Sequence, residues 1–140
     1  MDSFEKLQAY LKEECFSPFA LMIGKSNGYE GYVVWQSGSD FCFGYSERGE
    51  TRVLETFASE KEVIAYALKT VENDRWSKAH MVAFLWDETE VLQAEEELQA
   101  MNISYERNDS PHNRGNAYRI FVFGKDVLKL SDFKSRYIKY

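Results

Sequence analysis

The chain is poor in several residue types that particular protein classes require. It has two cysteines in 140 residues, too few for a disulfide-rich scaffold. Its longest apolar run, Met81–Trp86, has the length of a strand and falls far short of the roughly 18–20 residues that cross a membrane. Residues 1–6 lack the basic start and apolar run of a secretory signal. We therefore expect a cytoplasmic protein with no membrane partner, in which Cys15 and Cys42 are reduced.

Sequence signatures of catalysis and of cofactor binding are also lacking. The two histidines, His80 and His112, have no neighbouring ligand at a metal-site spacing. None of the eight glycines forms a dinucleotide-binding or phosphate-binding loop. We therefore expect no metal, no cofactor and no catalytic residue. One enzymatic alternative stays open, in which Cys42 is a nucleophile and His80 or His112 its base, because sequence alone does not show whether these side chains meet.

The composition is that of a folded, acidic protein. Hydrophobic residues make up 44% and aromatic residues 16%, enough apolar surface to offset the entropy that folding costs. The length is typical of one domain, so residues 1–140 are expected to form a single α+β domain. The net charge of −6 disfavours nucleic acid as a partner, because phosphate binding requires clustered Lys and Arg.

The periodicity of apolar residues predicts helices and strands in an order typical of α+β proteins. A helix over residues 2–15, capped by Asp2, comes first. Four strands follow, and Asn27-Gly28 predicts a tight hairpin between the first two. We expect an antiparallel or mixed sheet built on this four-strand meander, with the N-terminal, central and third helices packed on it. The predicted elements are strands 20–25, 29–36, 41–45 and 50–57, helix 59–72 with Ser59 at its cap, strand 81–86 buried on both faces, helix 88–101 with Asn102 at its C-terminal end, and strands 103–107 and 118–123. Alternation along strand 41–45 puts Phe41, Phe43 and Tyr45 on one face.

Charge is distributed unevenly along the chain. Residues 110–140 hold seven basic and two acidic side chains, a net +5, which leaves −11 for residues 1–109. The basic tail, residues 125–140, is expected to pack on the domain and to offset part of its acidic charge. A nucleic-acid-binding tail is the competing interpretation, and it lacks the exposed aromatic residues typical of such segments.

The third predicted helix carries only negative charge. No Lys or Arg occurs between Lys78 and Arg107, so no carboxylate of this helix has a local basic partner. One interpretation is a solubilising face, and the other is a docking surface for a basic protein. Trp76, in a polar link before the helix, is a further candidate for an exposed contact. The candidate partner-binding residues are Trp76, Asp87, Glu88, Glu90, Glu95, Glu96 and Glu97.

Three segments resemble the small cytosolic immunity proteins of bacterial polymorphic toxin systems. They are the aromatic meander Tyr29–Phe57, the helix SEKEVIAYALKTV that begins at Ser59, and the ending YRIFVFGKDVLKLSDF that begins at Tyr118. The resemblance implies a small, acidic, non-enzymatic protein that neutralises a cognate toxin domain by direct binding. A different class of function also stays open, a small adaptor or ligand-binding module with an aromatic pocket lined by Tyr32, Phe41, Phe43 and Tyr45.

Overall fold

The computed structural model describes residues 1–24 and 29–140. Its contacts divide the chain into two compact units, Met1–Lys78 and Ala79–Tyr140, and each is described by itself. The prediction of one domain over residues 1–140 stays a prediction. Helices and strands occur in both units, and the α+β class is confirmed.

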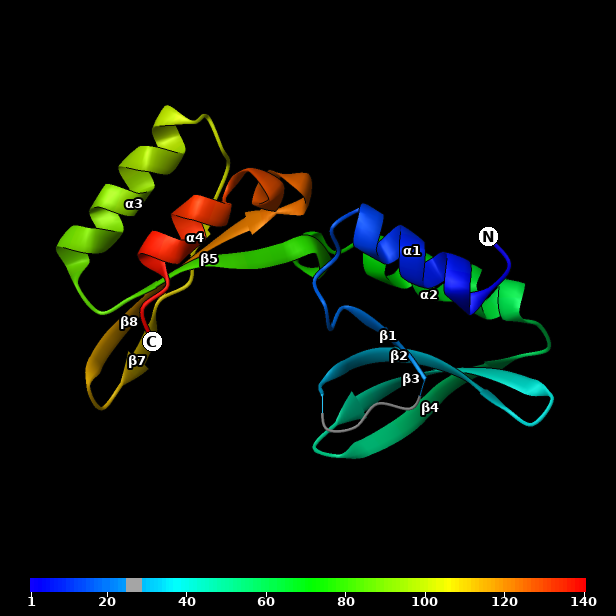
Figure 1. Ribbon diagram of the computed structural model, residues 1–140. Coiled ribbons are helices and arrows are strands. Elements are labelled where there is room, and N and C mark those ends of the chain that lie inside the picture. The colour runs from blue at the N-terminus through cyan, green and yellow to red at the C-terminus, as the bar shows by residue number, and fades with distance from the viewer. Residues whose placement is uncertain (25–28) are drawn as a thin grey trace. The chain divides into compact units, whose positions relative to one another are not determined.

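The first unit is a four-stranded sheet with two helices over one face (Figure 1). The strands lie in the order β1-β2-β3-β4, so the predicted meander is present. Its elements are α1 (Phe4–Glu13), β1 (Leu21–Ile23), β2 (Gly31–Ser37), β3 (Asp40–Glu47), β4 (Glu50–Phe57), α2 (Glu60–Glu72) and the 3₁₀ turn η1 (Arg75–Lys78).

The first strand pairs differently from the prediction. β2 with β3 and β3 with β4 are antiparallel, but β1 runs parallel to β2, with Met22 opposite Val33. The expected hairpin between the first two strands is therefore wrong, and its Asn27-Gly28 turn lies outside the described residues.

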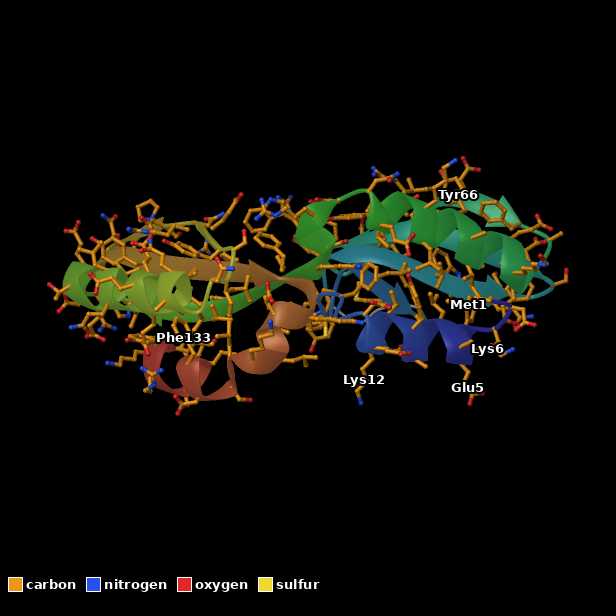
Figure 2. All side chains as sticks on the ribbon, turned by 90° about the horizontal axis from the view of Figure 1, so that it is seen from above. Met1, Glu5, Lys6, Lys12, Tyr66 and Phe133 are labelled. Carbon is orange, nitrogen blue, oxygen red and sulfur yellow. The ribbon has the colours of Figure 1, made fainter. Side chains whose placement is uncertain are left out.

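The two helices bury one apolar stripe each against the sheet. α1 begins at Ser3, whose hydroxyl accepts a 3.2 Å hydrogen bond from the Lys6 N–H, so the prediction of Asp2 as its cap is wrong. Leu7 and Leu11 of this helix are buried, whereas the charged residues of the same helix point outward (Figure 2). Ser59 caps α2 as predicted, by accepting from the Glu62 N–H at 3.2 Å.

Gly44 in β3 allows the Trp35 ring and the backbone of Arg52 to pack closely against β3, on the sheet face away from the helices. There Val33, Trp35 and Cys42 form a small buried cluster. A Cβ atom on Gly44 would lie 2.9 Å from Cη2 of Trp35 and would collide with the carbonyl of Arg52. A β-bulge also falls between Phe43 and Gly44. The position therefore requires glycine for reasons of space.

The second unit has its own sheet and its own helices (Figure 1). α3 and α4 pack on this sheet rather than on the meander, so the single sheet of the prediction is wrong for the third helix. The reason is that β5 pairs with β8 and not with a meander strand. The elements are β5 (Ala79–Leu85), α3 (Glu88–Ala100), β6 (Glu106–Arg107), β7 (Ser110–His112), β8 (Gly115–Phe123), the 3₁₀ turn η2 (Gly124–Lys129) and α4 (Ser131–Tyr137).

The core of the second unit lies between its sheet and its helices. Val82 and Leu85 of β5 and Ile120 of β8 are buried there together with Leu130 and Phe133 of the tail. Val82, Ala83 and Leu85 of β5 are buried, but Met81 and Phe84 are only half-buried, so the prediction of full burial on both faces is wrong.

The state of the cysteines and the length of the helices were also predicted from the sequence. Cys15 and Cys42 are both buried and form no disulfide. In the described part of the chain, no helix is long and apolar enough to cross a membrane.

Substituting Gly44 by Ala is expected to destabilise the first unit by about 1–3 kcal/mol, the usual cost of forcing extra volume into a packed core. Gly38→Ala is the matched control. Its φ of +62° costs an alanine roughly 1–2 kcal/mol, but nothing lies within 4 Å of the added carbon. Urea unfolding measures both, and equal stability of Gly44→Ala and the parent protein would contradict the packing argument.

Candidate functional site

The acidic helix α3 presents its candidate residues in three directions. Val91, Ala94 and Leu98 are buried against the sheet and define the inner face of the helix. Residues seven apart lie on the same flank of a helix, so Glu90 and Glu97 share one flank. Glu95 lies on the opposite flank. The burial pattern therefore separates carboxylates that contact the rest of the unit from those that face outward.

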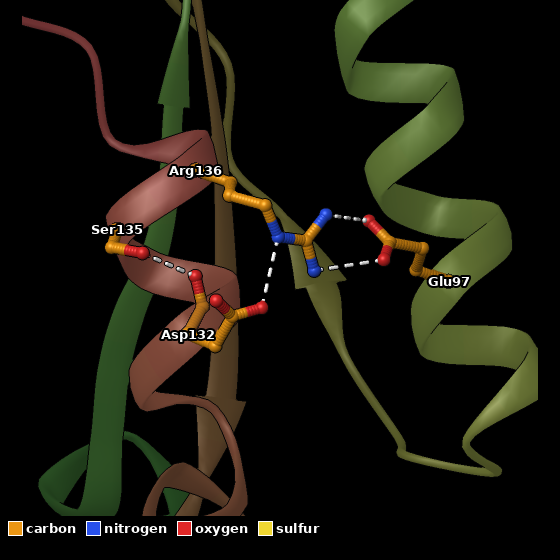
Figure 3. Close-up of polar contacts among 4 residues, drawn as sticks. All are labelled: Glu97, Asp132, Ser135 and Arg136. Atoms are coloured by element: carbon orange, nitrogen blue, oxygen red, sulfur yellow. Dashed lines mark hydrogen bonds and ion pairs between the residues drawn. The ribbon is translucent and has the colours of Figure 1, made fainter.

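Glu97 is bound by an arginine of the tail (Figure 3). The guanidinium of Arg136 donates two hydrogen bonds to its carboxylate, each 2.9 Å long, and a third of 3.0 Å to Asp132 one turn back in α4. The hydrogen bonds from Arg136 lower the pKa of Glu97 below its ordinary value. The paired fork fixes the position of α4 against α3.

Two further carboxylates of α3 also have basic partners within this unit. Nζ of Lys139 lies 2.6 Å from Oε2 of Glu90 on the α4 flank. On the other flank, Arg107 of β6 lies 3.7 Å from Oε2 of Glu95 and is shared with Asp109 at 2.7 Å. The basic tail therefore packs on the acidic helix and offsets its charge. Ten acidic and eight basic residues leave residues 79–140 with a net charge of only −2.

Asp87 has a local structural role. Its Oδ1 accepts a 2.8 Å hydrogen bond from the Thr89 N–H and caps the first turn of α3. A carboxylate here is also favoured by the positive end of the helix dipole.

Glu88 and Glu96 are the candidates on α3 that face solvent without an ion-pair partner among the described residues. They lie eight residues apart, and Leu92 occupies the position midway between them. Side chains four residues apart lie on neighbouring turns of one helix face. Leu92 is 48% exposed. The outer row Glu88–Leu92–Glu96 therefore combines two unpaired charges with an apolar centre.

Trp76 lies in the first unit, in η1, where it is 39% exposed. It lines a pocket with a volume of about 410 Å³, to which Tyr32 and Tyr45 also contribute. Two of the four residues predicted for an aromatic pocket are therefore brought together. The other two, Phe41 and Phe43, do not line it and pack instead with the core beneath α1 and α2.

The three residues of the enzymatic alternative, Cys42, His80 and His112, have different surroundings. Cys42 is only 6% exposed and packs with Val33 and Trp35, an environment typical of a structural thiol. His80 lies in β5, and His112 is exposed in β7 with its ring 5.4 Å from that of Trp86. Within residues 1–24 and 29–140, no group of three or more His, Cys, Asp and Glu side chains is arranged to hold a metal ion.

Comparisons of the chain with family models, with curated proteins and with solved structures found no match.

Sequence reasoning missed two features of this site. The first is the pairing of α3 with distant cations. Arg136 lies 39 residues after its partner Glu97, and Lys139 lies 49 residues after its partner Glu90, so no local pairing rule predicts these contacts. The second is Leu92 as an exposed contact. A helical wheel would have found this residue, because it lies opposite the apolar stripe.

The stability contributed by Glu97 should depend on pH. Because its pKa is lowered in the folded protein, this contribution is present above its unfolded pKa of about 4.3 and is lost as the pH falls through the lower folded value. Glu97→Gln should therefore lower the urea midpoint at neutral pH, and the difference from the parent should shrink below about pH 4. Glu96→Gln, on the neighbouring exposed carboxylate, should show no such change. A pH-independent difference for Glu97→Gln would contradict the ion-pair assignment.

Proposed function

We propose that this chain is a non-enzymatic binding protein of the immunity type, which neutralises a cognate toxin domain by direct contact in the bacterial cytoplasm. A basic surface of the partner docks on the outer face of α3. The observation that supports this proposal most is the outer row Glu88–Leu92–Glu96. The resemblance of the meander, the central helix and the ending to immunity proteins supports the class of function.

The outer row has the properties of a docking surface. The carboxylates of Glu88 and Glu96 attract a basic partner and favour it over acidic ones. Leu92, exposed between them, offers the apolar contact that an interface buries at its centre. The other carboxylates of α3 are engaged within the unit, so they hold the helix in place and leave the outer row to the partner.

A toxin that acts on nucleic acid fits this surface best. Enzymes that cleave nucleic acid hold phosphates with Lys and Arg, and a row of carboxylates presents negative charge to the same groups. Binding of this kind would cover the toxin's substrate site, and the inhibitor would need no catalytic group of its own.

The test begins with the gene immediately upstream of the one encoding this chain. If it encodes a large secreted protein, the C-terminal domain of that protein should bind the chain. The double variant Glu88→Lys/Glu96→Lys should weaken this binding by a factor of about ten or more, because two attractions become repulsions. Isothermal titration calorimetry measures the affinity, and co-expression measures protection from the toxin. Leu92→Ala should weaken binding without a change of charge.

The matched control reverses two exposed carboxylates on α1, Glu5→Lys/Glu13→Lys, and so changes the net charge of the chain by the same amount. It should leave the affinity nearly unchanged. Equal weakening by both double variants would show that net charge acts rather than the outer row. Full affinity of Glu88→Lys/Glu96→Lys, or an upstream protein that does not bind, would refute the proposal for α3.

A further inference from the structure

The pocket of the first unit is built from segments that lie far apart in the sequence. Tyr32 and Tyr45 come from β2 and β3, Thr70 and Val71 from the last turn of α2, and Phe19 from the turn before β1. Its volume of about 410 Å³ is within the range of small-molecule sites. The cavity is therefore large enough for a ligand of a few heavy atoms or for one long side chain.

The turn at Phe19 is held against the sheet by a close backbone approach. A Cβ atom on Gly31 would collide with the carbonyl of Phe19, and the φ of Gly31 is +151°, so glycine is required there. Buried Ser77 holds the opposite wall, because its Oγ lies 2.7 Å from the carbonyls of both Val71 and Asp74. The Ser77 carbonyl in turn accepts from the Ser17 N–H at 2.8 Å. The pocket is thus a preformed feature of this unit.

Aromatic rings form much of its wall. The rings of Tyr32 and Tyr45 meet edge to face, with centroids 5.3 Å apart. Phe19, which is 47% exposed, stacks on Tyr29 with centroids 4.4 Å apart. Trp76 is also among the lining residues. Aromatic faces carry partial negative charge and attract cations.

The charged groups of the lining have one sign. Glu30 and Asp74 line the pocket, and no Lys, Arg or His does so among the described residues. Neither carboxylate has an ion-pair partner in the described part of the chain. Oδ1 of Asp74 accepts a 2.9 Å hydrogen bond from the Trp76 N–H, so the backbone fixes the position of this carboxylate.

We propose that this pocket binds an organic cation, an alkylated ammonium or a guanidinium group, between the aromatic rings and the carboxylates of Glu30 and Asp74. The rings contact the apolar substituents of the cation and attract its charge, while the carboxylates neutralise it. This site lies in the first unit, and the proposal does not depend on docking at α3.

The first experiment compares choline with dimethylbutanol, in which an uncharged carbon replaces the ammonium nitrogen. The two probes have nearly the same shape, so a difference between them reports the charge. Titration of the full chain followed by amide chemical shifts in NMR should show that choline binds at least about fivefold more tightly, with shifts at Tyr32, Tyr45 and Trp76. Equal affinity of the two probes, or no shift with choline, would overturn the proposal.

The second experiment removes the charges without removing the fold. Asp74→Asn keeps the oxygen that accepts from the Trp76 N–H and loses only the charge, and Glu30→Gln does the same at the other carboxylate. Each should weaken choline binding about fivefold or more, and Tyr45→Ala should weaken it by removing a ring. Glu55→Gln, at an exposed carboxylate of β4 outside the pocket, should leave it unchanged. Full affinity in both Asp74→Asn and Glu30→Gln would overturn the proposal.

The source of the cation is distinguished with two further probes. N-acetyl arginine amide and N-acetyl lysine amide represent a basic side chain of a protein partner, and choline represents a free small molecule. Tighter binding of either blocked amino acid assigns the pocket to a basic side chain, and tighter binding of choline assigns it to a free ammonium compound. Both results support the cation site. Neither result depends on whether α3 binds a partner, so the two proposals can fail independently.

Discussion

The negative charge of helix α3 is offset by cations from other parts of its unit. Five glutamates within thirteen residues repel one another, and the helix has no basic residue of its own. Arg136, Lys139 and Arg107 supply that balance from the tail and from β6. Each pair is exposed enough that its individual contribution to stability is modest, so the burial of Val91, Ala94 and Leu98 supplies most of the attachment. The ion pairs add to this attachment on both flanks of the helix.

The acidic residues of α3 and its cap fall into two groups, those with a contact inside the unit and those without one. Glu90, Glu95 and Glu97 have partners within the unit, and Asp87 caps the helix, so a change at any of them alters the unit itself. Glu88 and Glu96 have no ion-pair partner among the described residues. Glu88 lies in the first turn of α3, where the helix dipole favours a carboxylate, whereas the charge of Glu96 has no such compensation. Charges of this second kind are the ones that a binding partner can use, which is why the outer row supports the proposed function better than the acidity of the helix as a whole.

How far the sequence could predict the fold depended on the range of each interaction. The cap at Ser59, the ends of α2 and the left-handed Asn102 after α3 follow from local rules, and they were predicted correctly. Pairing between strands is not local. Nothing near Leu21–Ile23 indicates a parallel partner, and the Asn27-Gly28 pair favoured the wrong one. The same limit hid the second sheet, since β5 finds its partner in β8 more than thirty residues later.

The pocket residues also show that local patterns are predictable from the sequence and tertiary contacts are not. Alternation along β3 correctly placed Phe41, Phe43 and Tyr45 on one face of the sheet, but it did not show where the helices end above that face. Phe41 and Phe43 pack with the core beneath α1 and α2, whereas Tyr32 and Tyr45 line the pocket together with Thr70 and Val71 of the last turn of α2. The contribution of Phe19 depends on its backbone contact with Gly31, a tertiary feature that turn chemistry does not encode.

Both proposed sites favour positive charge, yet they do so by different physics. On α3 the carboxylates stand in solvent, where salt screens charges separated by more than about 8 Å, so they act mainly on the rate and choice of encounter. In the pocket the carboxylates of Glu30 and Asp74 are exposed as well, and what differs is the aromatic rings beside them, whose faces attract a cation at contact distance. In these two proposals, the acidic charge of the chain serves two separate purposes. One is to draw a basic surface toward α3, and the other is to hold a single cationic group at a defined position.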